Sequence, residues 1–341
     1  MIILMLIRKK LLIFCKLIFI LLSLVVSQNL VARVIYPFYI ANQNPFIQIF
    51  GLPKSEPAAI VNDGSVGLIT ALDMVSNTVQ GHNANETLVL DGESYKLNFE
   101  FKYAVDGTEY LMQLPVIRHS SGRFDNFIRS WHHVFRLSNA EQKQFPANQL
   151  SYDYAYNGRQ IISVDSSQSG MGDLRLGIAR YLMKSQTPSL RQAVMRASIK
   201  LPTGDSEKLM GSGGADISFE IAMQDENLLS RYRIGVFGQA GALWLGRSDL
   251  FYDVQRHVVA YGAAGVTWNY SNGVILRSQL NLHSSFYDSN IVDIGGDSVQ
   301  LTVGGSILYS GANRVDIGIT ENLFTNATPD FGVNVTYRSL F

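Results

Sequence analysis

The chain has 341 residues, among them 28 basic and 28 acidic side chains and a single cysteine. Four of the basic residues and none of the acidic ones lie within residues 1–16, so the rest of the chain has a small excess of acids. This composition excludes a strongly basic surface for nucleic acid, and the single cysteine excludes a fold held together by intrachain disulfide bonds.

Residues 1–32 have the three parts of a secretory signal peptide. A basic stretch, residues 1–16, precedes an apolar run at residues 17–26, and small-residue cleavage sites end at Ser27 and at Ala32. The apolar run is too short for a helix that crosses ~30 Å of hydrocarbon. We therefore expect export, with cleavage after Ala32 or, alternatively, after Ser27.

Residues 33–63 form an irregular N-terminal segment. It contains four prolines and shows no sustained period. Prolines at this density exclude the segment from a strand ladder. It either hangs in the periplasm or folds back into the lumen of a barrel as a plug, where its neutral polar run at residues 42–44 would hydrogen-bond a charged inner face.

Residues 64–341 alternate between apolar and polar side chains over many short stretches, which is the period of a strand with two different faces. In residues 93–106, four aromatic side chains share one face and charged side chains occupy the other. Strands are predicted at residues 65–76, 93–106, 110–118, two within 148–165, 172–183, 191–201, 215–224, 230–242, 257–270, 274–286, 297–309, 314–321 and 330–341. These are fourteen strands, or twelve in the barrel if the hairpin within residues 148–165 lies outside the membrane. Both numbers are even, as in bacterial outer-membrane barrels.

The connections between these strands alternate between long and short along most of the chain. The long connections are residues 77–92, 119–149, 202–214, 243–256, 286–296 and 322–330. Outer-membrane barrels join their strands by short periplasmic turns and longer external loops. A soluble β-sandwich, the alternative, has no reason to sort its connections in this way. We therefore predict an all-β, transmembrane, antiparallel up-and-down β-barrel at residues 64–341, with both termini in the periplasm.

The last predicted strand, residues 330–341, ends the chain on an aromatic residue. Tyr337 and Phe341 lie on its apolar face. A terminal aromatic strand of this kind is typical of bacterial outer-membrane barrels, where it is part of the signal that the barrel-assembly machinery reads. The expected partners are therefore that machinery, outer-membrane lipid and lipopolysaccharide, and no nucleic acid.

Three stretches of the sequence resemble a known bacterial family. They are residues 42–53, 119–129 and 198–205, which include Asn-Gln-Asn-Pro-Phe, His-Ser-Ser-Gly-Arg-Phe-Asp and Leu-Pro-Thr-Gly. The family is of unknown function and is called domain of unknown function 3187. Residues 201–204 and 211–216 are also similar to outer-membrane proteins of phenol meta-pathway clusters, which are loosely akin to fatty-acid transporter barrels. The resemblance implies an outer-membrane barrel and favours small hydrophobic molecules as its cargo, and no catalytic residue carries over from it.

Charged residues of both signs occupy the polar faces of the predicted strands and should point into the lumen. They are Lys96, Glu100, Lys102, Asp173, Arg175, Arg196, Lys200, Asp216, Glu220, Arg277, Arg314, Asp316 and Arg338. They either line an aqueous path and tune its selectivity or form cross-strand ion pairs that only stiffen the wall. The second interpretation is favoured for most of them, because an isolated ion pair says little about function.

One stretch, residues 123–135 in the longest predicted external loop, has the period of a helix. Its apolar residues fall on a single stripe and are Phe124, Phe127, Ile128, Trp131 and Phe135. This short helix either gates the mouth as a lid or interfacial helix, or packs on the rim of its own barrel.

The sequence shows neither a metal site nor a catalytic site. His132 and His133 are adjacent in the predicted helix and do not share a face. His-Ser pairs at residues 119–120 and 283–284 invite comparison with lipid hydrolases, but a nucleophile also needs a base in reach and an orienting third group. We therefore predict a passive channel or transporter for small molecules, without a cofactor. The alternatives are a lipid hydrolase and a structural or surface-interaction barrel.

Overall fold

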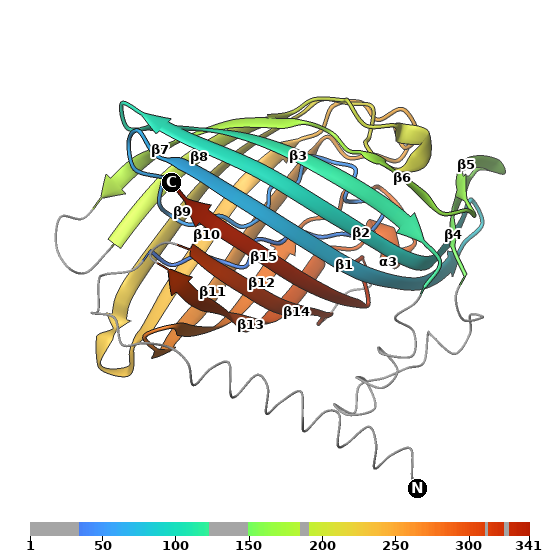
Figure 1. The fold of residues 1–341 in the computed structure, drawn as a ribbon. Helices are drawn as coiled ribbons and strands as arrows, with labels where there is room; N and C mark the ends of the chain where they lie inside the picture. Colours follow the sequence, from blue (N-terminus) through green and yellow to red (C-terminus); the bar gives the residue numbers. More distant parts are fainter. Residues whose placement is uncertain (1–33, 123–148, 185–190, 311–312, 324–326) are drawn as a thin grey trace, which may run out of the picture.

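The computed structural model describes residues 34–122, 149–184, 191–310, 313–323 and 327–341. Long tilted strands close into an antiparallel barrel (Figure 1). The strands of the ring are β1 (Val66–His82), β2 (Glu86–Val105), β3 (Thr108–Ser120), β7 (Arg175–Lys184), β8 (Arg191–Lys200), β9 (Asp216–Leu229), β10 (Ile234–Trp244), β11 (Val258–Ser271), β12 (Val274–His283), β13 (Ser298–Ser310), β14 (Asn313–Asn322) and β15 (Phe331–Leu340). The ring closes because β1 pairs with β2 on one side and with β15 on the other.

Within the described residues, twelve strands form the ring, which is the predicted alternative and not fourteen. The hairpin predicted within residues 148–165 exists as β4 (Ser151–Tyr156) and β5 (Arg159–Val164), but it pairs with residues 86–91 of β2, beyond the ring. A short β6 (Gln168–Met171) pairs with β3. The ring has fewer strands than fourteen because β2 is longer than most of its neighbours. The edge of its extension is free to pair with β4 outside the ring.

The connection predicted at residues 77–92 is mostly strand. The ladder between β1 and β2 continues from the pair Ser76 and Glu93 to the pair His82 and Thr87. The two strands rise beyond the ring, and their apolar side chains there pack against other segments at the same end. Burial of those side chains explains why the hairpin continues where the sequence suggested a loop.

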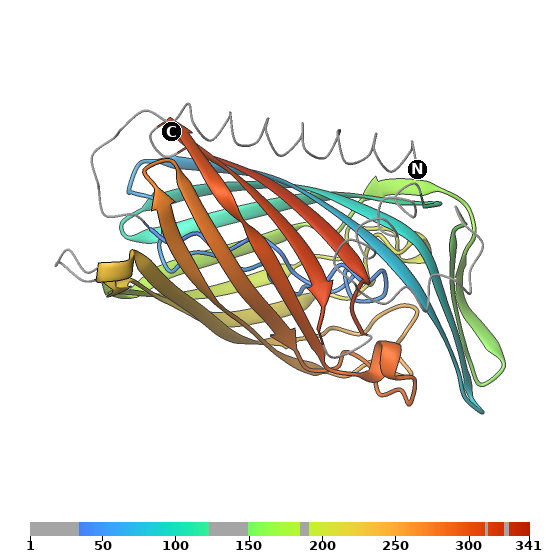
Figure 2. The ribbon, with the colours of Figure 1, turned by 90° about the horizontal axis from the view of Figure 1, so that it is seen from below.

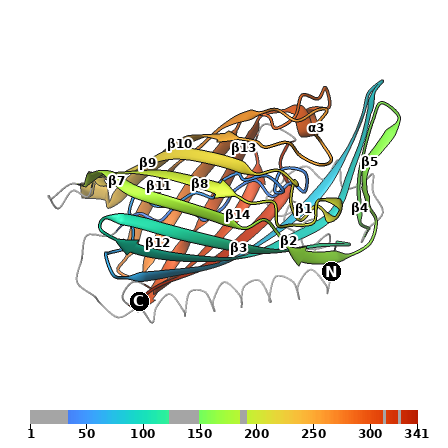
Figure 3. The same ribbon diagram turned by 90° about the horizontal axis from the view of Figure 1, so that it is seen from above.

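The two ends of the barrel differ. One end, called the loop end, carries the β4–β5 hairpin and the short helix α3 (Val292–Gly295), as Figures 1 and 3 show. The other, called the turn end, carries the tight turn at Asp106 and Gly107, both at positive φ, and the C-terminus. The remaining short helices are η1 (Ser206–Lys208) and η2 (Ser230–Tyr232). The helix predicted at residues 123–135 lies outside the described residues.

The two faces of the wall have opposite chemistry. On β2, Glu100 is 2% exposed and its neighbour Phe101 is 41% exposed, because successive side chains point to opposite faces. Apolar and aromatic side chains of most other ring strands are exposed in the same way. The outer face is therefore an apolar belt and the inner face is polar, as in a membrane barrel with a polar interior.

Among the described helices, none is both long enough and apolar enough to cross a membrane.

Candidate functional site

Residues 34–62, called the lumen segment, run inside the ring (blue in Figures 1 and 2). The ring of Tyr36 lies 4.2 Å from the guanidinium of Arg314, near the start of β14 at the turn end. The middle of the segment reaches the loop end, where the Tyr287 hydroxyl donates to the carbonyl of Phe46. Its chain then returns to the turn end, where Asp63 accepts a hydrogen bond from the N–H of Gly107 (3.1 Å). The segment therefore passes through the lumen once in each direction.

The backbone of the lumen segment is held by cations of the inner wall. An irregular segment rich in proline leaves carbonyl groups without ladder partners, and buried carbonyls need a donor. Five of the predicted lumen-facing residues supply one: Lys96 to Gln48 (3.3 Å), Arg175 to Gly51 (2.5 Å), Arg196 to Ala59 (3.0 Å), Lys200 to Ile49 (3.2 Å) and Arg338 to Pro37 (3.3 Å). These donors lie on β15, β2, β7 and β8, which belong to one half of the ring, so the segment is held mainly against that half.

Two charged side chains of the segment form buried ion pairs with the wall. Lys54 pairs with Asp73 on β1, and Glu56 pairs with Lys102 on β2. Lys102 also lies near Glu100 (3.3 Å), a second wall carboxylate. Sequence reasoning missed Lys54 and Glu56 because the segment has no period from which a facing direction can be inferred. Asp73 was detectable, since it lies on the polar face of an alternating strand.

The polar run at residues 42–44 has partners other than the expected charged inner face. The side-chain amide of Asn42 donates to His283 Nε2 (2.8 Å) and to the carbonyl of Ala327 (2.8 Å), both uncharged. The side-chain oxygen of Asn42 accepts the N–H of Asn44 (2.9 Å), which folds the run onto itself. The run therefore shapes the tip of the segment and does not neutralise wall charges.

Aromatic rings cover the tip of the lumen segment at the loop end. Phe46 packs against Phe251 (centroids 5.1 Å apart), and Phe50 stacks on Phe286 (5.4 Å). Tyr154 of the β4–β5 hairpin packs against the same group, and burial together with its hydrogen bond to the Glu86 carboxylate raises the pKa of its hydroxyl. The apolar tip therefore seals against the external connections.

The charged residues of the inner wall fall into two sets. The paired half, on β1–β3 and β7–β9, has cations that meet carboxylates, such as Lys200 with Asp173 (2.7 Å). The arginine half, on β12–β15, contains Arg277, Arg314 and Arg338. Arg338 Nε (3.2 Å) and Arg277 Nη2 (3.9 Å) both form ion pairs with the carboxylate of Asp316.

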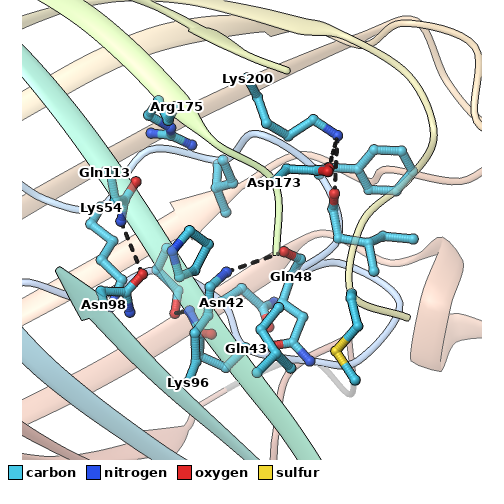
Figure 4. Close-up of a pocket in the computed structure, with 17 residues that line it drawn as sticks. Asn42, Gln43, Gln48, Lys54, Lys96, Asn98, Gln113, Asp173, Arg175 and Lys200 are labelled. Atoms are coloured by element: carbon cyan, nitrogen blue, oxygen red, sulfur yellow. Dashed lines mark hydrogen bonds and ion pairs between the residues drawn. The ribbon is translucent and has the colours of Figure 1, made fainter. Parts of the chain in front are cut away.

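The structure places all thirteen predicted lumen residues toward the interior. Twelve are buried, and Lys96 is half-buried. Figure 4 shows several of them around a small pocket beside the lumen segment, with Lys200 next to Asp173 and Gln113 bonded to Asn98 (3.0 Å). This pocket measures about 30 Å³, close to the space of one water molecule. A second cavity, at the turn end, measures about 200 Å³.

The histidines of the two His-Ser pairs do not contact the neighbouring serine hydroxyls. His119 Nδ1 is hydrogen-bonded to Ser94 Oγ (2.8 Å). His283 Nδ1 donates to the carbonyl of Ser284 (2.9 Å), which fixes Nε2 as the acceptor for Asn42. Among the described residues, histidine, cysteine and acidic side chains do not gather in groups of three that would hold a metal ion. His132 and His133 lie outside the described residues.

Of the residues expected to form the assembly signal, Tyr337 stacks on Tyr309 (6.4 Å) and Phe341 is 73% exposed at the turn end. The backbone of Phe341 still pairs with Val66, so the strand is bonded to its end. A role in assembly remains a prediction. The loop-helix residues Phe124, Phe127, Ile128, Trp131 and Phe135 lie outside the described residues.

Comparison with known proteins gives a family and a fold. The sequence model of the family described as "Protein of unknown function (DUF3187)" matches residues 13–341, which confirms the resemblance seen in the sequence. No curated protein matches the chain in sequence. Among solved structures, the COG4313 outer membrane channel from Pseudomonas putida F1 superposes with a TM-score of 0.56 at 14% identity, over 82% of this chain and 97% of that one. This likeness shows the fold of an outer-membrane β-barrel.

Two further solved structures overlap less well. The TodX ΔS2S3 mutant monoaromatic hydrocarbon channel gives a TM-score of 0.38 at 12% identity, over 82% of this chain and 90% of that one. The Ralstonia pickettii toluene transporter TbuX gives 0.37 at 11%, over the same shares of the two chains. These two are too distant to add to the argument.

Proposed function

We propose that this chain, which belongs to the family described as protein of unknown function (DUF3187), is a passive outer-membrane channel for small molecules whose lumen its own residues 34–62 close. The observation that carries the proposal is the manner in which the lumen segment is held. Its bonds to the wall are side-chain hydrogen bonds and two ion pairs, without a strand ladder to the ring.

This manner of filling distinguishes a channel from a barrel that is only structural. A structural barrel is stabilised when wall side chains fill its interior. Here a separate segment occupies the lumen, and water can replace each of its side-chain bonds at a modest net free-energy cost. The ring ladder is complete without the segment, since β1 pairs with both of its neighbours. The segment can therefore leave the lumen without opening the wall.

The proposed setting follows from the two faces and the two ends. The apolar belt suits outer-membrane lipid and lipopolysaccharide, and the terminal strand suits the barrel-assembly machinery. The turn end would face the periplasm, which puts both termini there after removal of residues 1–32 or 1–27. Fractionation tests this location, because the protein should appear in outer membranes with heat-modifiable mobility. Recovery as a soluble periplasmic protein would overturn the proposal.

The closure is tested by deleting residues 36–57 and recording single-channel conductance in planar bilayers. We expect a large rise over the intact protein, because the cavities that remain around the segment are small. Unchanged conductance would show that the segment does not restrict passage. Heat-modifiable mobility of the deletion variant checks that the barrel still folds.

A matched pair of double variants tests the same point without a deletion. Lys54→Met with Glu56→Gln removes both ion pairs of the lumen segment and should increase the frequency of opening. Lys208→Met with Asp205→Asn removes an exposed ion pair (2.6 Å) that lies outside the lumen and should leave it unchanged. An equal frequency of opening in the two double variants would contradict the proposal that these two ion pairs keep the lumen closed.

A further inference from the structure

The small pocket of Figure 4 lies between the lumen segment and the wall, and most of its charged lining is cationic. The charged side chains that line it are those of Lys54, Lys96, Arg175, Lys200 and Asp173. Four of these five are cations. The charge that the pocket presents therefore depends on which of the four have carboxylate partners.

Two of the four cations are compensated. Lys54 pairs with Asp73 on β1, and Lys200 pairs with Asp173 (2.7 Å) and Asp216 (3.2 Å). The one carboxylate in the lining, that of Asp173, is therefore already bound by a lysine.

Arg175 on β7 has no carboxylate within ion-pair distance among the described residues. Its ladder partners are Gln113 on β3 and Lys200 on β8, and a like charge directly opposite destabilises a sheet. Its Nη2 donates to the carbonyl of Gly51 (2.5 Å), which is an uncharged acceptor. The guanidinium therefore has no close counterion in its ladders or in the lumen segment.

The carboxylates on another side of Arg175 have cations of their own. Glu100 and Glu220 line a second small cavity together with Arg175. Glu100 pairs with Lys102 (3.3 Å), and Glu220 pairs with Arg196 (3.8 Å). These two carboxylates therefore do not form an ion pair with Arg175, and its charge stays available to the pocket.

Lys96 on β2 is likewise without a carboxylate within ion-pair distance in the described part of the chain. Its ladder partners are Asp73 and Ile117, but Asp73 forms its ion pair with Lys54. The ammonium donates to the carbonyl of Gln48 (3.3 Å), and an ammonium has three donors. This single bond to an uncharged group leaves the positive charge of Lys96 without a counterion.

The side-chain amide of Gln48 is a third group in the pocket that lacks a partner. Gln48 is 4% exposed, and neither its Nε2 nor its Oε1 has a hydrogen-bond partner among the described residues. A buried amide without partners costs free energy, and a bound water or ion is a common reason for such a group. Its NH₂ end is a donor that an anion can accept.

We propose that this pocket binds one small monovalent inorganic anion, such as chloride, between Lys96, Arg175 and the side-chain amide of Gln48. The anion compensates the two cations that have no carboxylate, and it accepts a hydrogen bond from the buried amide. A volume of about 30 Å³ admits a particle close to the size of a water molecule and is too small for an organic acid. Because the three groups belong to β2, β7 and the lumen segment, the bound anion ties the segment to the wall.

Water is the alternative occupant of the pocket. A water molecule would satisfy the amide of Gln48 but would leave the charges of Lys96 and Arg175 uncompensated, and a buried charge without a partner is costly. The two occupants differ in one measurable respect, because only the anion makes the stability of the folded barrel depend on the anion of the buffer.

The inference goes beyond the proposed function and does not depend on it. The site needs only the lumen segment in the position that the structure shows, whether or not the segment ever leaves the lumen.

Urea unfolding of the detergent-solubilised full-length barrel tests the site, with chloride as the probe and gluconate as the replacement anion at constant ionic strength. A ligand that binds only the folded protein stabilises it by mass action. Each tenfold rise in chloride above its dissociation constant should therefore raise the equilibrium constant for folding about tenfold. A folding equilibrium that is the same in chloride and in gluconate would overturn the proposal.

Variants separate the site from effects of chloride on the protein surface. Lys96→Met with Gln48→Leu should abolish the dependence on chloride, and Lys96→Arg, which keeps the charge, should retain part of it. Arg196→Gln is the matched control, because it removes a buried lumen cation that does not line this pocket. It should retain the full dependence, even in a less stable barrel. Equal dependence in the double variant and in the unaltered protein would overturn the proposal.

Bromide locates the anion directly and needs no variant. In crystals of the full-length barrel grown in sodium bromide, anomalous scattering should show a bromide within hydrogen-bond distance of Lys96, Arg175 and Gln48. A pocket without an anomalous peak, in crystals where bromide is found elsewhere on the protein, would refute the site.

The two proposals fail separately. Chloride-dependent stability of the intact barrel, without any conductance after deletion of residues 36–57, refutes the channel and retains the site. Conductance after the deletion, without chloride-dependent stability of the intact barrel, retains the channel and refutes the site.

Discussion

The paired half and the arginine half of the inner wall differ in how their cations meet carboxylates. In the paired half, Lys200 lies within 2.7 Å of Asp173 and 3.2 Å of Asp216, and Lys102 has three carboxylate neighbours. In the arginine half, the ion pairs of Arg277 and Arg338 share Asp316. Three carboxylates therefore surround Lys102, whereas Arg277 and Arg338 share one.

The lumen segment is bound in different ways by the two halves. In the paired half, most charges are locally compensated, and both ion pairs of the lumen segment are formed there. In the arginine half, the segment contributes aromatic rings and the carbonyl of Pro37, none of which carries a negative charge. The ion pairs that anchor the lumen segment are therefore confined to the paired half.

The largest expected difference is between the stabilities of variants at two carboxylates, Asp316 and Glu100. Asp316→Asn should lower the free energy of unfolding by about 3–5 kcal/mol, because it leaves buried arginines without their shared anion. Glu100→Gln should cost about 1 kcal/mol or less, because Lys102 keeps Glu56 and Glu109. Urea unfolding in detergent, followed by the heat-modifiable gel shift, measures both. Equal losses would mean that the two halves are compensated alike.

A smaller difference in stability is expected between variants at two arginines that have different cross-strand partners. Arg196 lies opposite Glu220 in the ladder between β8 and β9, whereas Arg314 lies opposite Arg338. Arg196→Gln should destabilise the barrel by about 1–3 kcal/mol, since it leaves Glu220 and a carbonyl of the lumen segment with fewer partners. Arg314→Gln should cost about 1 kcal/mol or less, because the relief of like-charge repulsion with Arg338 offsets the contacts that it loses. The same urea titration decides, and a larger loss for Arg314→Gln would contradict the stated imbalance.

The barrel and the inward direction of its charged side chains could be predicted from the sequence, because alternation determines which face of a strand each side chain occupies. It did not reach the split of those charges into two halves, since that depends on which strands become neighbours when the ring closes. Arg314 and Arg338 are on adjacent strands, but their direct opposition depends on register. The ring count was ambiguous because the β4–β5 hairpin alternates like the wall strands. Lys54 and Glu56 were missed because a segment without a period gives no facing direction.

The smallest expected effect is on ion selectivity after deletion of residues 36–57. With the aromatic rings of the segment removed, the arginine half lines the pore directly, and fixed charges at a pore wall set its selectivity. Reversal potentials in a KCl gradient should show that Arg277→Gln lowers the anion-to-cation permeability ratio by roughly a factor of two, a modest change because salt screens single charges. Arg196→Gln, in the same deletion background, removes an equal charge that Glu220 already offsets and should shift the ratio less. Equal shifts would show that ions respond to the total charge of the wall, and the distinction between the two halves would then have no role in permeation.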